Sequence, residues 1–111
     1  MPMTMPTPSE DGLARFEEIG SSMAGRGVVP CKMFGMPIFK VRGKAFAGLW
    51  GGAMVFKLTG EDHAAALALE GAELFDPSGM GRAMKEWVVV PPDQAEAWPD
   101  LADAAFDYVP G

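Results

Sequence analysis

The chain has 111 residues, of which 49% are hydrophobic and 22% charged, and this size and composition predict one globular domain. No stretch reaches the roughly 20 apolar residues of a membrane helix, and the first residues lack the pattern of a signal peptide. We therefore expect a cytoplasmic protein without a membrane partner. A single cysteine, Cys31, and a single histidine, His63, exclude an intrachain disulfide and the usual zinc sites, so we expect no metal or other cofactor.

The net charge of −6 conceals a strong asymmetry along the chain. Residues 19–60 contain six Lys or Arg and no Asp or Glu, whereas residues 61–111 contain eleven acidic and two basic residues. Such a division predicts a polarised surface, which can steer a partner or drive self-association between opposite faces. The excess of acidic residues disfavours non-specific electrostatic binding of nucleic acid.

The first 60 residues predict a tail, a helix and an antiparallel meander. Residues 1–8 are proline-rich and are expected to form a flexible tail, and the domain is expected to span residues 9–111. Ser9 is a good N-cap for a helix that ends near Gly25 and Gly27. Strands are expected over 28–34, 38–41, 44–50 and 53–58, with tight turns at Arg42-Gly43 and Gly51-Gly52.

The second half predicts two more helical segments and two more strands. Thr59 and Asp62 have the spacing of a capping box for a helix that Gly71 ends. A short strand over 72–75 and a longer one over 82–90 follow, with Trp87 and Val89 expected on the buried side of the longer one. A helical segment after Pro91 is expected to be interrupted at Trp98-Pro99 and to continue to Tyr108.

This order of elements predicts an α+β fold. We expect two layers, with a single antiparallel sheet of about five or six strands and helices packed on one face, in the order helix–strands–helix–strands–helix.

Two glycine-punctuated basic segments carry a resemblance to a known family. With the hairpin between them, they are similar to the TfoX N-terminal domain (TfoX/Sxy) family; the motif residues are Lys32, Met33, Phe34, Gly35, Gly81, Arg82, Met84 and Lys85. The resemblance implies a two-layer α+β domain and a bacterial regulator. The best-known members regulate natural competence with a transcription activator and carry a second, helical domain. We expect here a stand-alone N-terminal-type domain without that second domain. The resemblance implies no catalytic residues.

No catalytic constellation stands out in the sequence, so we expect a domain without enzymatic activity. His63 has no recognisable nucleophile or oriented carboxylate as a partner. The segment from Gly79 to Arg82 is glycine-rich but lacks the spacing of a phosphate-binding loop.

The best candidate for an interaction surface is the central hairpin. It comprises the residues Phe39, Lys40, Arg42, Lys44 and Trp50, in which a basic rim accompanies large aromatic side chains. Our first hypothesis is that this surface binds another protein or a second copy in a homodimer. The alternatives are a small-ligand pocket lined by methionine and aromatic residues and, ranked third, direct contact with nucleic acid.

Overall fold

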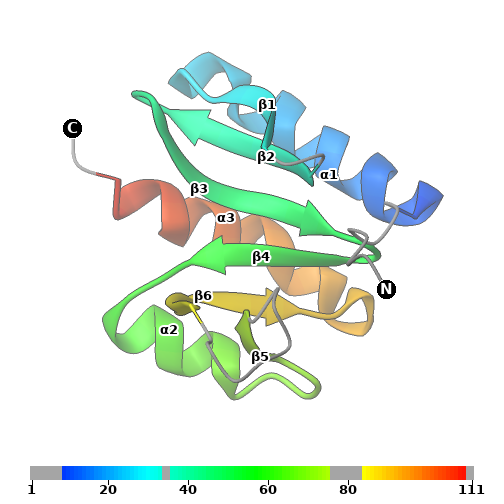
Figure 1. Cartoon of the computed structure of the whole chain (residues 1–111), viewed down its shortest axis with the longest axis vertical. Coiled ribbons are helices and arrows are strands. Elements are labelled where there is room, and N and C mark those ends of the chain that lie inside the picture. Colours follow the sequence, from blue (N-terminus) through cyan, green and yellow to red (C-terminus); the bar gives the residue numbers. More distant parts are fainter. Residues whose placement is uncertain (1–8, 34–35, 76–83, 110–111) are drawn as a thin grey trace, which may run out of the picture.

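The computed structural model describes residues 9–33, 36–75 and 84–109, which form one sheet and its covering helices (Figure 1). The α+β class and the order helix–strands–helix–strands–helix are confirmed. The elements are α1 (Glu10–Met23), η1 (Ala24–Arg26), β1 (Val29–Met33), β2 (Met36–Val41), β3 (Lys44–Trp50), β4 (Ala53–Lys57), α2 (Gly60–Leu67), β5 (Glu73–Phe75), β6 (Met84–Val90), η2 (Pro92–Ala97) and α3 (Trp98–Asp107).

The six strands pair antiparallel in the order β1-β2-β3-β4-β6-β5. The first four form a meander, and β6 then lies between β4 and β5. The turn between β2 and β3 is the predicted Arg42-Gly43 turn, and its two residues have φ of 52° and 78°. A type I′ hairpin turn requires positive φ at both central positions, and this turn matches the right-handed twist of the strands.

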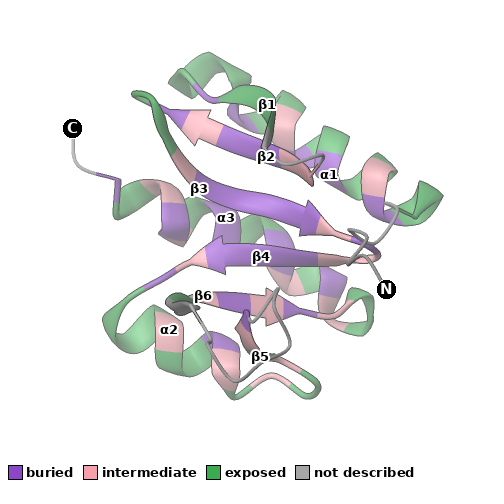
Figure 2. Ribbon diagram, viewed as in Figure 1, coloured by how far each residue is buried: buried purple, intermediate pink, exposed green. Residues whose placement is uncertain are grey.

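Helices α1 and α3 lie behind the sheet in the view of Figure 1, and the main hydrophobic core fills the space between the two layers. The helix α1 begins as expected, because the Ser9 Oγ accepts a hydrogen bond of 3.0 Å from the Gly12 N–H. Its buried side chains Phe16, Ile19 and Met23 recur at helical spacing and pack on the sheet. Figure 2 shows the resulting burial along the central strands.

The predicted orientation of β6 is wrong. Val88 and Val90 are fully buried and face the helices, whereas Trp87 and Val89 are half-buried on the opposite side. The pairing with β4 decides this, because Val88 lies opposite Phe56, whose side chain belongs to the core beneath the helices.

The predicted capping box of α2 is also absent. Thr59 is the N-cap residue with an extended backbone, but its side chain makes no capping hydrogen bond. Asp62 instead accepts a hydrogen bond of 2.9 Å from the Tyr108 hydroxyl, which holds the end of α3 near the start of α2. A tertiary hydrogen bond between Tyr108 and Asp62 therefore replaces the local capping hydrogen bond that was expected.

Candidate interaction surface

The structure separates the five residues predicted to form one interaction surface. Phe39 is only 1% exposed, because strand alternation turns it toward α1, where its ring stacks on Phe16 with centroids 4.0 Å apart. Phe39 therefore belongs to the core and is not part of an exposed surface.

Trp50 lies at the opposite end of β3 from Lys44, about 20 Å away along the strand. It is half-buried, and its ring meets that of Phe75 edge to face with centroids 5.0 Å apart. This pair lies with Val55, fully buried, on the outer face of the sheet, the side turned away from α1 and α3. Trp50 is thus separated from the basic hairpin.

Arg42 is directed toward the C-terminal end of the described chain. Its Nη2 donates a hydrogen bond of 3.0 Å to the Val109 carbonyl oxygen, and its Cζ lies 5.6 Å from the centre of the Phe106 ring. The Cζ of Arg26 lies 4.1 Å from the centre of the same ring, and this guanidinium pairs with Asp103. These cation–π and ionic contacts attach α3 to η1 and to the turn between β2 and β3, which gives Arg42 a structural role.

Lys40 and Lys44 remain at the surface, and the structure adds Val29 to them. Val29 is 56% exposed and lies directly opposite Lys40 in the pairing of β1 with β2, so their side chains share the outer face of the sheet. Lys44 lies at the same end of the hairpin but opposite the core residue Val41, so its side chain starts from the helix-facing side; Lys32 lies at the other end of β1. We call Val29, Lys40 and Lys44 the basic corner.

The lysines of the basic corner have no described carboxylate partner, unlike Arg26 and Lys57. Arg26 pairs with Asp103, and Lys57 lies 3.9 Å from Glu86. Among the described residues, no carboxylate lies within ion-pair distance of Lys40 or Lys44, nor of Lys32 at the other end of β1. The basic corner therefore presents positive charge next to an exposed aliphatic side chain, and no described carboxylate neutralises it.

The corner lies at a sheet edge that resists backbone pairing. The strand β1 pairs on one side with β2, and Met33 lies opposite Met36 across a two-residue connection. In a hairpin with a two-residue connection, the residues that flank the connection form a hydrogen-bonded pair, and every second pair along the strands does the same. The backbone N–H and C=O groups of Met33, Cys31 and Val29 therefore point toward β2, whereas the backbone N of Pro30 faces away from the sheet. Proline has no N–H to donate, which interrupts the free edge. A partner is therefore expected to contact side chains here rather than extend the sheet.

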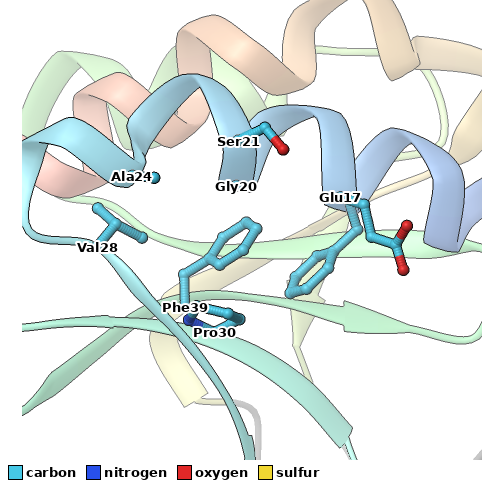
Figure 3. A pocket seen from close by; sticks show the side chains of 8 residues that line it. Glu17, Gly20, Ser21, Ala24, Val28, Pro30 and Phe39 are labelled. Carbon is cyan, nitrogen blue, oxygen red and sulfur yellow. The ribbon is translucent and has the colours of Figure 1, made fainter.

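A shallow groove of about 370 Å³ separates α1 from β1 (Figure 3). Gly20 faces the Phe39 ring, and a Cβ at this position would lie 2.8 Å from Phe39 Cε1, so only glycine permits this approach of α1. The lining contains two phenylalanines and none of the described methionines; it comprises Phe16, Glu17, Gly20, Ser21, Ala24, Val28, Pro30 and Phe39.

The Tyr108 hydroxyl joins the end of α3 to the start of α2. Its single proton lies between two acceptors, the Thr59 carbonyl oxygen at 2.7 Å and Asp62 Oδ2 at 2.9 Å. A side-chain hydrogen bond with Thr59 lowers the pKa of Tyr108, but the hydrogen bond to Asp62, desolvation and the nearby negative charges outweigh it and raise the pKa above its usual value. The phenol therefore remains a neutral donor at physiological pH.

The two basic segments of the sequence do not meet in space. Lys32 and Met33 lie in β1, and Met84 and Lys85 lie in β6, with three strands between them. At the usual strand spacing this places the two segments about 19 Å apart. Phe34, Gly35, Gly81 and Arg82 fall outside the described residues.

The chain matches no family model, no curated protein and no solved structure at a significant level. Within the described residues, no helix has the length and apolar character needed to cross a membrane. The same residues contain no group of three or more His, Cys, Asp or Glu side chains arranged to hold a metal ion.

Proposed function

We propose that this protein is a non-enzymatic interaction domain that binds an acidic protein surface at the basic corner. The observation that carries the proposal is the exposed Val29 side chain directly opposite Lys40, with Lys44 at the same end of the hairpin and no described carboxylate paired with either lysine. An aliphatic side chain next to unpaired cations fits a partner that presents an apolar contact among carboxylates.

The electrostatics of the whole chain favour a protein partner over nucleic acid. The long-range field of a chain with net charge −6 opposes the approach of a polyanion. A short acidic segment needs only the local potential of the corner. The resemblance of the sequence to the TfoX N-terminal domain, whose best-known members work with a transcription activator, agrees with this proposal.

Inverting the charge of Lys40 is expected to weaken binding of an acidic peptide about tenfold, because an attractive contact becomes a repulsive one. The probe is a fluorescein-labelled peptide of alternating Glu and Leu, and the readout is fluorescence anisotropy at low salt. Arg15→Glu is the matched control, since it inverts one exposed charge on α1 and changes the net charge equally. Equal weakening by Lys40→Glu and Arg15→Glu would show that only net charge matters and would contradict the proposal.

A labelled DNA duplex in the same assay separates the proposed function from nucleic-acid binding. The proposal expects the peptide to bind and the duplex to remain unbound at the same salt concentration. Duplex binding that weakens in Lys40→Glu would favour the nucleic-acid alternative.

The groove between α1 and β1 favours a second candidate function, the binding of a small apolar ligand. Its floor is the stacked pair Phe16 and Phe39, and the Glu17 carboxylate lies at its rim in Figure 3. These features suit a ligand that combines a flat apolar body with an amine.

Benzylamine is a suitable probe for the groove. At a concentration about tenfold above its Kd, such a ligand adds about 1.4 kcal/mol of stability and raises the melting temperature by roughly 6 °C. Ser21→Phe covers the groove and is expected to remove the shift, whereas Ala14→Phe places the same ring at an exposed position of α1 outside the groove and is expected to keep it. A flat melting temperature for wild type with benzylamine, indole and hexanoate would count against this candidate.

A further inference from the structure

We infer that the acidic partner of the basic corner also inserts a tryptophan side chain into the groove between α1 and β1. This inference rests on the proposed function and describes the partner more closely, as a short segment that carries carboxylates and, a few residues away, a tryptophan. The position of the groove, the charges around the two surfaces, and the size and lining of the groove support it.

The groove and the basic corner share the edge strand β1. Successive side chains of a strand point to opposite faces of the sheet. Val29 lies opposite Lys40 on the outer face. Pro30 lies opposite the core residue Phe39 and lines the groove on the helix-facing side, as does Val28 (Figure 3). The groove and the corner are therefore separated only by the thickness of one strand, about 10 Å from side chain to side chain.

A partner can reach both surfaces because the outer edge of β1 is open. In the described sheet β1 is the first strand and pairs only with β2, and the residues 29–32 are all exposed. Because Pro30 offers no N–H at this edge, a segment that crosses the strand is favoured over one that pairs with it. A span of about 10 Å corresponds to about three extended residues.

The charges of the two surfaces differ in sign, and this fixes the order of the groups on the partner. Lys40 and Lys44 make the corner positive, and no described carboxylate pairs with them. Among the described residues that line the groove, only Glu17 is charged. Carboxylates of the partner are therefore attracted to the corner and repelled from the groove, so an uncharged side chain is expected in the groove.

The groove has the size and lining of a site for one aromatic side chain. Its volume of about 370 Å³ is at the lower end of the range for ligand pockets. The stacked rings of Phe16 and Phe39 form its floor and favour an aromatic contact. Glu17 and Ser21 in the lining supply oxygen atoms that accept a hydrogen bond from an indole N–H. Tryptophan combines this donor with a large apolar surface and often dominates the binding energy of an interface.

Two matched peptides test the inference by fluorescence anisotropy at low salt. Both are the alternating Glu and Leu peptide with its label at one end and an amidated extension at the other, Gly-Gly-Trp in the first and Gly-Gly-Ala in the second. Wild type is expected to bind the Trp peptide about tenfold more tightly than the Ala peptide, because the aromatic contact adds to the ionic one. Equal affinities of the two peptides overturn the inference.

Two variants with the same added ring show whether the groove causes this difference. Ser21→Phe covers the groove and is expected to abolish the advantage of the Trp peptide while leaving the affinity of the Ala peptide unchanged. Ala14→Phe adds the ring at a position of α1 outside the groove and is expected to keep the advantage. Both positions are exposed, so both variants are expected to fold. An advantage that survives in Ser21→Phe overturns the inference.

The charge variant Lys40→Glu tests whether one partner occupies both surfaces. It is expected to weaken both peptides by the same factor. A Trp peptide that is weakened by Ser21→Phe but not by Lys40→Glu overturns the inference, because the groove then binds an aromatic group independently of the corner. The Ala peptide reports on the proposed function alone: if wild type does not bind it, the proposed function itself fails, whereas Lys40-dependent binding of both peptides with equal affinity refutes only the inference.

Discussion

Replacing Trp98 with alanine is expected to lower the free energy of unfolding by about 3–5 kcal/mol. Trp98 is fully buried at the start of α3 and is the largest of the side chains with almost no exposed surface. Its removal leaves a cavity between the helical layer and the sheet that the rigid strands cannot fill. Because the total free energy of unfolding of a small domain is about 5–15 kcal/mol, this variant should lose a large part of it. Urea denaturation followed by circular dichroism measures the loss.

Trp98→Phe separates the effect of volume from that of the indole N–H. No described group accepts a hydrogen bond from Trp98 Nε1, so the phenylalanine loses no hydrogen bond within the described protein. We expect less than half of the destabilisation seen with alanine. An equal loss in both variants would mean that something other than packing holds Trp98 in place.

Replacing Phe39 with alanine is also expected to cost about 3–5 kcal/mol. Its ring is stacked on Phe16 and its centroid lies 6.3 Å from that of the Phe46 ring, so both neighbouring aromatic side chains lose contacts. The expected defect is in stability rather than in binding. At a temperature where the variant is folded, its affinity for the acidic peptide should equal that of wild type.

Val29→Ala provides the converse of this experiment. Val29 is exposed, so its truncation is expected to change the free energy of unfolding by less than about 0.5 kcal/mol. It should nevertheless weaken peptide binding, because it removes the apolar contact of the basic corner. The assignment of Phe39 to the core would be contradicted if Phe39→Ala weakened binding without affecting stability.

Much of the fold could be predicted because local signals agreed with the global structure. Ser9 caps α1 as its side-chain chemistry requires, and Arg42-Gly43 forms the turn between two alternating strands. The strand expected over 53–58 is present as β4, with Met54 and Phe56 on the face that packs on the helices. The sidedness of β6 was predicted wrongly, because both of its faces are largely apolar and alternation alone cannot choose between them.

The interaction surface was less predictable than the fold. Lys40 and Lys44 were identified from the charge pattern, but Phe39 and Trp50 were grouped with them only because they are near in sequence. Val29 was not identified, since its exposure depends on its position in an edge strand. Arg26 and Phe106 were also not identified as contact partners, because they lie far apart in sequence and the packing of α3 brings them together.

The sequence by itself determined the α+β class, the order of the elements and the division of charge between residues 19–60 and 61–111. These features follow from side-chain periodicity, turn chemistry and composition, all of which act over a few residues. Only the tertiary structure decided which charges are paired. Long-range strand register and helix packing place Arg26 against Asp103 and leave Lys40 beside the exposed Val29.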